Sequence, residues 1–292
     1  MRPLQIFAAL FLVLFAATQA VAAPAAPRFT VTVEGEGPDV ILIPGLASSS
    51  AVWEATAARL RGHYRVHLIQ VSGFAGAPAA GNAEGLVAAP LAEALAAYIG
   101  EQHLRAPAVI GHSLGGETGL MLAARHPALV GRLMAVDALP FYSLLFNPAA
   151  TPETVRPQAD QMRDMLLGMS PEQAQTAGAA AIARLVKTES ARPAPIAWSN
   201  ASDRGVVARA MHELITTDLR PELARISVAV TVLYAHDPLY GIPAEAVDGL
   251  FRSAYTGVPH LQLQRIADSF HFIMLDQPEA FAAAVDRFLA GN

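Results

Sequence analysis

The sequence predicts an α/β fold, in which a mostly parallel central sheet is flanked by helices and interrupted by a helical cap. Apolar runs of strand length alternate with segments of helical period, as in folds built from strand–helix–strand units. Several of these runs are continuously apolar, which is typical of strands that are buried on both faces. The alternation stops between Leu139 and Ile226, where helical segments follow one another.

Seven segments have the length and composition of strands. In chain order they are 28–34, 39–45, 64–73, 107–113, 132–140, 228–235 and 260–266. The expected helices are one capped by Ser50, then 84–102, 114–127, 244–251, and a final helix from Asp276 with Pro278 in its first turn. A sheet of this kind places the carboxyl ends of its strands at one edge, where open α/β sheets bind ligands.

Residues 1–27 differ in composition from the rest of the chain. One cation, Arg2, precedes an apolar run from Ile6 to Ala17, and the small residues Ala20-Val21-Ala22 fit the rule for signal cleavage. The apolar run is shorter than the roughly 20 residues that span a bilayer. We therefore expect residues 1–23 to be a secretory signal peptide, with an uncleaved anchor as the alternative. The protein would then be exported, either to a bacterial periplasm or out of the cell.

The expected domain organisation is one α/β core in two parts, separated by the cap. The core comprises residues 24–138 and 227–292, and the helical cap comprises residues 139–226. The sequence has 292 residues, of which 53% are hydrophobic and 15% are charged, so it can bury one large core.

Charge and composition argue against several kinds of function. The formal net charge of −5 gives no indication of a nucleic-acid surface. The sequence has no cysteine, which excludes disulfides, thiolate metal sites and a cysteine nucleophile. The histidines are dispersed and lack the spacing of metal ligands, so no metal site is expected.

A serine between two glycines is the strongest chemical signal in the sequence. In VIGHSLGGE, Ser113 lies where a predicted buried strand ends and a helix begins, with Gly111 and Gly115 two positions to either side. We expect a tight turn that holds Ser113 at positive φ, where the glycines remove side chains that would collide with it. A chance match in a chain rich in Gly and Ala is the alternative, but the strand before and the helix after favour a nucleophile elbow.

A serine nucleophile needs a base, and the base needs an acid that orients it. In proteins with this elbow, the acid and then the histidine follow the serine along the chain. His271 comes shortly after the last predicted strand, and Asp237 comes directly after the strand before it. We therefore predict a triad of Ser113, Asp237 and His271. Asp137, at the end of an earlier strand, is the alternative acid, and Asp268 is a weaker third candidate.

The same chemistry needs N–H donors that stabilise a developing oxyanion. One donor is expected from Leu114, the residue after the nucleophile, and the other from Leu46, in the loop after the strand 39–45. The cap should determine specificity. Its large apolar side chains could line a pocket, although at helical spacing such residues more often pack internally: Met162, Met165, Leu166, Leu167, Met169 and Trp198.

These motifs resemble the α/β-hydrolase superfamily. The matching segments are ILIPGLASSSAVW, VIGHSLGGETGLMLAARHP, TVLYAHDP and FHFIMLDQPEAF, which together extend over nearly the whole chain after the signal peptide. The resemblance implies an eight-stranded, mostly parallel sheet, a helical cap between the sixth and seventh strands, and hydrolysis without a cofactor. The sequence departs from the family pattern at Pro44, where His is frequent, at Phe270, where Gly is frequent, and in a longer loop after Asp237.

The expected function is that of a serine hydrolase that cleaves a small-molecule carboxylic ester through an acyl-enzyme. A peptidase or amidase and a carbon–carbon bond hydrolase are alternatives, because they use the same triad. A non-catalytic binding protein on the same fold is the alternative from a different class, and it predicts a broken triad. The expected partner is a small-molecule substrate, without nucleic acid and without stable membrane insertion after signal cleavage; the sequence leaves the oligomeric state open.

Overall fold

The computed structural model describes residues 26–291, so the predicted signal peptide, residues 1–23, lies outside the described residues. Within this range one sheet has the strand order β1-β3-β2-β4-β5-β6-β7. The strands are β1 Phe29–Glu34, β2 Asp39–Ile43, β3 Arg65–Val71, β4 Ala108–His112, β5 Arg132–Val136, β6 Ala229–His236 and β7 Leu261–Ala267. All seven strands predicted from the sequence are confirmed, whereas residues 26–291 contain no eighth strand of the kind that the resemblance implied.

The sheet is parallel except at one edge. β1 pairs antiparallel with β3, and every other neighbouring pair is parallel. The side chains of β1 are exposed or half-buried, and none is fully buried, as expected for an edge strand. The residues of β2, β4 and β5 are almost all buried, which explains why these strands are continuously apolar in the sequence.

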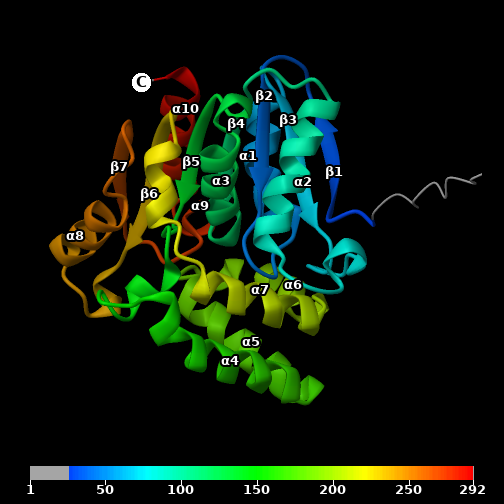
Figure 1. Cartoon of the computed structure of the whole chain (residues 1–292), viewed down its shortest axis with the longest axis vertical. Helices are drawn as coiled ribbons and strands as arrows, with labels where there is room; N and C mark the ends of the chain where they lie inside the picture. The colour runs from blue at the N-terminus through cyan, green and yellow to red at the C-terminus, as the bar shows by residue number, and fades with distance from the viewer. Residues whose placement is uncertain (1–25, 292) are drawn as a thin grey trace, which may run out of the picture.

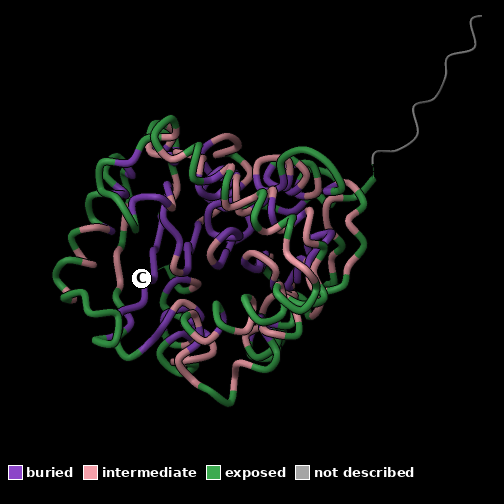
Figure 2. The backbone as a smooth tube through the Cα atoms, turned by 90° about the horizontal axis from the view of Figure 1, so that it is seen from below, coloured by how far each residue is buried: buried purple, intermediate pink, exposed green. Residues whose placement is uncertain are grey.

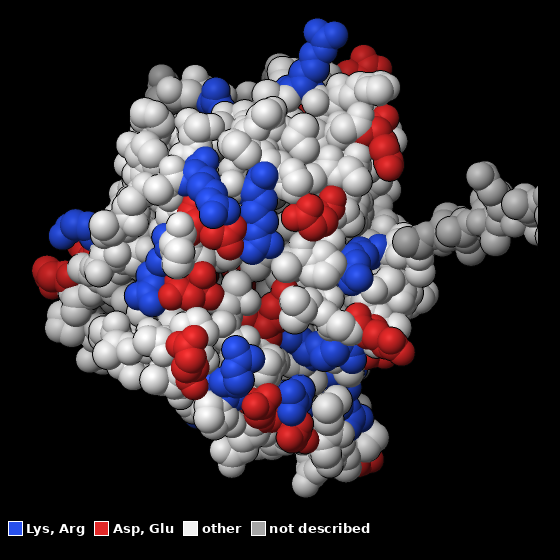
Figure 3. All heavy atoms as spheres, in the orientation of Figure 1, with Lys and Arg blue, Asp and Glu red and all other residues white. Residues whose placement is uncertain are grey.

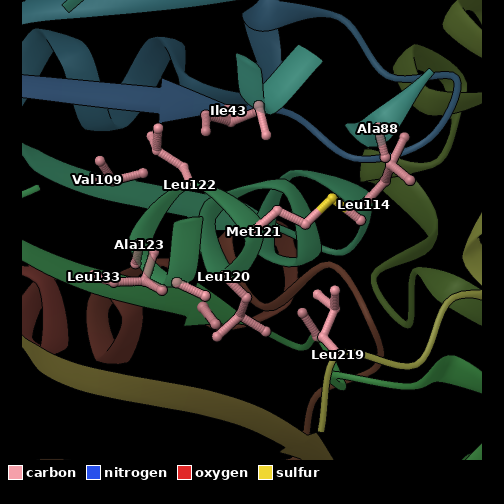
Figure 4. Packing of buried hydrophobic residues seen from close by; sticks show 14 of the residues in the cluster. Ile43, Ala88, Val109, Leu114, Leu120, Met121, Leu122, Ala123, Leu133 and Leu219 are labelled. Atoms are coloured by element: carbon pink, nitrogen blue, oxygen red, sulfur yellow. The ribbon is translucent and has the colours of Figure 1, made fainter. Parts of the chain in front are cut away.

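Helices cover both faces of the sheet (Figure 1). One face packs against α2 Ala88–Glu101, α3 Leu114–Arg125 and α8 Ala244–Ala254, and the other packs against α1 Glu54–Leu60, α9 Ile273–Asp276 and α10 Pro278–Ala290. Figure 2 shows the buried segments inside and the exposed segments around them. In Figure 4, apolar side chains of α3 lie against Ile43 of β2, Val109 of β4 and Leu133 of β5. This packing holds α3, which begins directly after Ser113, in the middle of the core.

Three predicted helix starts are wrong by a few residues, and the last helix begins at Pro278 rather than at Asp276. Ser49 rather than Ser50 caps the short 3-10 helix that precedes α1, since its side chain accepts the N–H of Ala51. The helix predicted from residue 84 begins at Ala88. The N–H groups at the start of α2 donate to the carboxylate of Glu213, a residue distant in the sequence.

The helical segment between β5 and β6 forms a layer of its own. It contains α4 Pro152–Gly168, α5 Pro171–Leu185, α6 Pro193–Ala201 and α7 Arg204–Thr216, in which α4 packs on α7 and α5 on α6. Figure 1 shows these four helices together, below the sheet and beyond the ends of its strands. Two strands, β6 and β7, follow them in the chain, so the cap lies between the fifth and sixth of seven strands, whereas the resemblance implied the sixth and seventh of eight.

Three prolines of this segment begin helices, and Pro157, which lies inside α4, does not end that helix. α4, α5 and α6 each start with a proline, at a position where a missing N–H costs no hydrogen bond. Thr151 and Ser170 precede two of these prolines and complete capping boxes. A series of helices can therefore follow one another in a segment that is rich in proline.

Within residues 26–291, no helix is both long enough and apolar enough to cross a bilayer.

Candidate active site

Ser113 lies at the tip of a sharp turn between β4 and α3. Its backbone has φ 54° and ψ −120°, so the predicted positive φ is confirmed. The N–H of Ser113 donates to Val136 O at 2.9 Å, and its carbonyl accepts the N–H of Glu117 at 3.0 Å. The strained conformation is therefore held by β5 on one side and by the first turn of α3 on the other.

The two flanking glycines are required, but the reason differs from the predicted one. A Cβ on Gly111 would lie 2.1 Å from the carbonyl oxygen of Gly115. A Cβ on Gly115 would lie 2.3 Å from the carbonyl oxygen of Ile43, at the end of β2. The missing side chains would thus collide with the first turn of α3 and with the neighbouring strand, not with Ser113 itself.

The loop after β2 packs closely against the elbow. A Cβ on Gly45 would lie 3.1 Å from Ser113 Cβ, which brings the loop that carries Leu46 against the nucleophile. Neither the N–H of Leu46 nor that of Leu114 has a hydrogen-bond acceptor among the described residues. Unpaired backbone donors beside a strained serine are what an oxyanion site needs.

His271 is paired with Asp137. Its Nδ1 lies 2.7 Å from Asp137 Oδ2, and both side chains are mostly buried. The Nδ1–H therefore donates to the carboxylate, which leaves Nε2 as the nitrogen that can accept a proton. The predicted pairing of His271 with Asp237 is wrong in this structure, and the alternative acid, Asp137, occupies that place.

Local backbone geometry explains the choice of Asp137. This residue follows β5 directly and has φ 47°, a left-handed conformation that Asp tolerates better than most residues. Its N–H donates to Leu233 O at 2.7 Å, and its Oδ1 accepts the N–H of Ala235 at 2.9 Å. With one carboxylate oxygen fixed by the backbone of β6, the other oxygen is directed at His271.

Asp237 instead faces the cap. Its Oδ2 lies 2.6 Å from Lys187 Nζ, and its Oδ1 accepts the N–H of Leu239 at 2.8 Å. Burial acts to raise the pKa of the Asp237 carboxyl, but the hydrogen bonds from Lys187 and the Leu239 N–H outweigh burial and lower it. The weaker candidate, Asp268, has an exposed side chain 3.9 Å from Lys187 Nζ.

His112, the last residue of β4, connects the turn at Ser113 to the segment after β7 that carries His271, residues 268–272, which is called the histidine loop below. Its ring centroid lies 4.6 Å from that of His271, and its Nε2 donates to the carbonyl of His271 at 3.1 Å. Burial, followed by the nearby His271 imidazole, lowers the pKa of His112 well below its usual value, so this ring stays neutral. Among the described residues, Ser113 Oγ makes no hydrogen bond. The structure thus places the two loops together without the serine–histidine bond, which in unliganded enzymes is often long.

Other predicted features lie elsewhere in the structure. Met165 and Leu167 of α4 are about half exposed, and Trp198 of α6 packs against the α1 and α10 side of the core. Of the predicted lining residues, Met165 and Met169 line a cavity of about 480 Å³. A cavity of about 820 Å³ opens between β1 and α2 and contains none of the predicted site residues. The described part of the chain contains no group of three or more potential metal ligands.

Sequence reasoning missed two residues that hold the histidine loop, Lys187 and Asp276. The sequence did contain an indication that Lys187 is unusual, because it is the only lysine in a sequence with 19 arginines. Asp276 was identified only as the start of the last helix. Its side chain instead accepts the N–H groups of Lys187, Thr188 and Phe270. Phe270, where the family often has Gly, stacks on Tyr240 with ring centroids 4.8 Å apart.

Comparisons with known proteins identify the family of the chain. Residues 38–278 match the family model described as the alpha/beta hydrolase fold. A pimeloyl-acyl-carrier-protein methyl ester esterase from Aeromonas hydrophila is 39% identical over 117 residues, which cover 39% of this chain and 43% of that protein. The enzyme of the same name from Yersinia enterocolitica is 27% identical over 261 residues, which cover 87% of this chain and 94% of the relative.

Among solved structures, the enol-lactonase from Burkholderia xenovorans superimposes with a TM-score of 0.69. It is 22% identical, and the match covers 90% of this chain and 96% of that one. At this identity the likeness concerns the fold alone. The family match includes the elbow, Asp137 and His271, so the chain belongs to the α/β hydrolase family, as its motifs predicted, and it is a hydrolase.

Proposed function

We propose that the protein is a serine hydrolase that cleaves a small-molecule carboxylic ester through an acyl-enzyme, with Ser113 as nucleophile, His271 as base and Asp137 as the orienting acid. The observation that carries the proposal is the 2.7 Å contact between His271 Nδ1 and Asp137 Oδ2, on a loop joined through His112 to the elbow. A non-catalytic protein would have no need for an imidazole held in one tautomer, on a backbone that is hydrogen-bonded to the residue before a strained serine.

The proposed chemistry proceeds in two steps. His271 Nε2 takes the proton of Ser113 Oγ as this oxygen attacks the ester carbonyl, and the N–H groups of Leu46 and Leu114 stabilise the oxyanion. The imidazolium returns the proton to the leaving alcohol. His271 then takes a proton from water as the water oxygen attacks the acyl carbon. The imidazolium gives this proton to Ser113 Oγ as the bond between this oxygen and the acyl carbon breaks, which releases the acid and restores Ser113 and His271.

The charge of the cap supports a small and largely uncharged substrate. Helices α4 to α7, residues 152–216 with their connections, contain seven Lys and Arg and seven Asp and Glu residues, so their formal charge balances. Figure 3 shows blue and red side chains interspersed on the face that it draws. The curated relatives are named for a methyl ester. We propose an ester of a short alcohol, without assigning the relatives' carrier protein to this chain.

The test is hydrolysis of short-chain aryl and methyl esters, with fluorophosphonate labelling, in wild type, Ser113→Ala and His271→Ala. We expect wild type to be labelled and active, and each variant to lose at least about 10³-fold in kcat. Hydrolysis of an aryl amide at a rate similar to that of the aryl ester would favour an amidase. A wild type that neither reacts with the probe nor turns over any ester would favour a binding protein.

We also propose that the protein is exported, because the composition of residues 1–23 is that of a signal peptide. Expression of the full chain in a bacterial host, followed by cell fractionation and N-terminal sequencing, tests this. We expect a periplasmic product that begins at residue 23 or 24. A cytoplasmic product that retains Met1 would contradict export.

A further inference from the structure

We propose that Lys187 is a positioning residue for His271, because it fastens a segment of the cap to the loop that carries the imidazole. This segment, residues 185–188, joins α5 to the next 3-10 helix and is called the strap below. The inference rests on the proposed function, in which His271 is the base.

The strap is bonded to the backbone directly after His271. The N–H of Phe272 donates to the carbonyl of Leu185, the first residue of the strap, at 3.1 Å. Val186 is fully buried in the same apolar cluster as Phe272 and Ile273. The chain on the C-terminal side of His271 is therefore packed against the strap and hydrogen-bonded to it.

The strap is also connected to the backbone directly before His271, through one carboxylate. Asp276 Oδ2 accepts the N–H of Lys187 at 3.1 Å and the N–H of Phe270 at 2.9 Å. Asp276 Oδ1 accepts the N–H of Thr188 at 2.9 Å. Both residues that flank His271 are thus connected to the strap, so a displacement of the strap displaces the imidazole.

The side chain of Lys187 fixes the strap to the end of β6. Its Nζ lies 2.6 Å from Asp237 Oδ2, and Asp237 is 1% exposed, whereas the lysine side chain is 36% exposed. A buried carboxylate strongly favours a partner that carries positive charge. Removing the ammonium would leave the carboxylate of Asp237 buried and unpaired. We expect the strap to move in response, so that water can reach the carboxylate.

The other side of the strap is bonded to the cap. Arg192, which directly precedes α6, donates from Nε to Val186 O at 2.8 Å and from Nη2 to Lys187 O at 3.2 Å. The strap is therefore bonded both to the start of α6 in the cap and to the residues that flank His271. The position of the cap and the geometry of the base are coupled through the ion pair of Lys187 and Asp237.

The test compares Lys187→Met, which keeps the length of the stem but removes the charge, with wild type. We expect kcat to fall about ten- to hundredfold, because small misplacements of a catalytic group cost rates of this order. KM should stay within about twofold, since the lysine ammonium is paired with Asp237 and lies near Asp268 rather than bonding Ser113 or the oxyanion donors. Lys187→Arg, which restores a cation, should recover most of kcat.

The matched control is Arg265→Met. Arg265 Nη1 lies 2.7 Å from Asp248 Oδ2, and its side chain is 35% exposed, close to the value for Lys187, but it is on β7 and away from the strap. This variant should keep the kcat of wild type. An equal loss in both variants, an unchanged kcat in Lys187→Met, or a change confined to KM would overturn the proposal.

A measurement that needs no substrate separates this inference from the proposed function. Hydrogen exchange of the Phe270 and Phe272 amides should become at least about tenfold faster in Lys187→Met and stay unchanged in Arg265→Met. If wild type hydrolyses no ester but these amides respond, the strap holds the loop and only the hydrolase assignment fails. If wild type is active and these amides do not respond, the positioning role of Lys187 is wrong.

Discussion

Asp137 and Asp237 follow neighbouring parallel strands, β5 and β6, yet they have different partners. Asp137 turns into a left-handed conformation and pairs with His271, whereas Asp237 continues in extended conformation, with φ −138° and ψ 138°, and pairs with Lys187. The difference teaches that a carboxylate at a strand end is only a candidate. The first backbone turn after the strand decides whether its side chain faces the site or the cap.

The largest expected effect on kcat/KM comes from replacing each of the two aspartates in turn, and the result could contradict this comparison. Asp137→Asn should lower kcat/KM by about 10³- to 10⁴-fold, because the amide no longer favours the required tautomer of His271 or stabilises its charged form. Asp237→Asn should lower it by less than about 20-fold, since it acts only through the strap. Steady-state hydrolysis of one aryl ester measures both. The reverse order would return Asp237 to the triad.

The pH dependence of stability tests whether the ion pair of Asp237 with Lys187 stabilises the fold. The pKa of Asp237 is lower in the folded protein than its usual value, so its ion pair stabilises the fold above about pH 4, the pKa of an unfolded Asp. This contribution is lost as the pH falls through the lower, folded pKa. The melting temperature of wild type should therefore exceed that of Asp237→Asn at pH 7, and the gap should narrow towards pH 3. A gap that does not change with pH would show that the ion pair contributes no stability.

Glu117 of α3 is a buried carboxylate without a partner, and it should show the opposite dependence. Its oxygens make no hydrogen bond among the described residues, and burial, with the nearby Glu213, raises its pKa well above the usual value. A raised folded pKa means that stability is lost as pH increases above about 4.3, by at most about 1.4 kcal/mol per pH unit. Glu117→Gln removes this loss, so thermal melts should show the variant gaining on wild type from pH 5 to pH 8. Parallel curves for the two proteins would contradict a neutral Glu117.

Much of the candidate site could be predicted from the sequence. The G-x-S-x-G spacing at Ser113 predicted the strained turn, because only glycine avoids the backbone contacts that surround it. His271 was found from its place after the last strand. Leu46 and Leu114 were found from their positions relative to β2 and to the serine, although their role as donors stays a prediction.

The pairing of the acid could not be predicted in the same way. Both Asp137 and Asp237 satisfy the sequence criterion, and what separates them is a φ of 47° at Asp137 together with a lysine that arrives from the cap. A single backbone angle leaves no periodic pattern in a sequence. A contact between positions 187 and 237 leaves none either, apart from the isolated lysine.

The sequence by itself determined the seven strands, the helical interruption and the elbow, because each depends on local periodicity or on steric limits close along the chain. Only the tertiary structure decided which aspartate meets His271, where α2 begins and what holds the histidine loop. These features depend on charged and polar side chains that meet across long sequence separations, as Glu213 does with Val87 and Lys187 with Asp237. Such partners are selected by three-dimensional proximity and by the cost of leaving a buried charge unpaired.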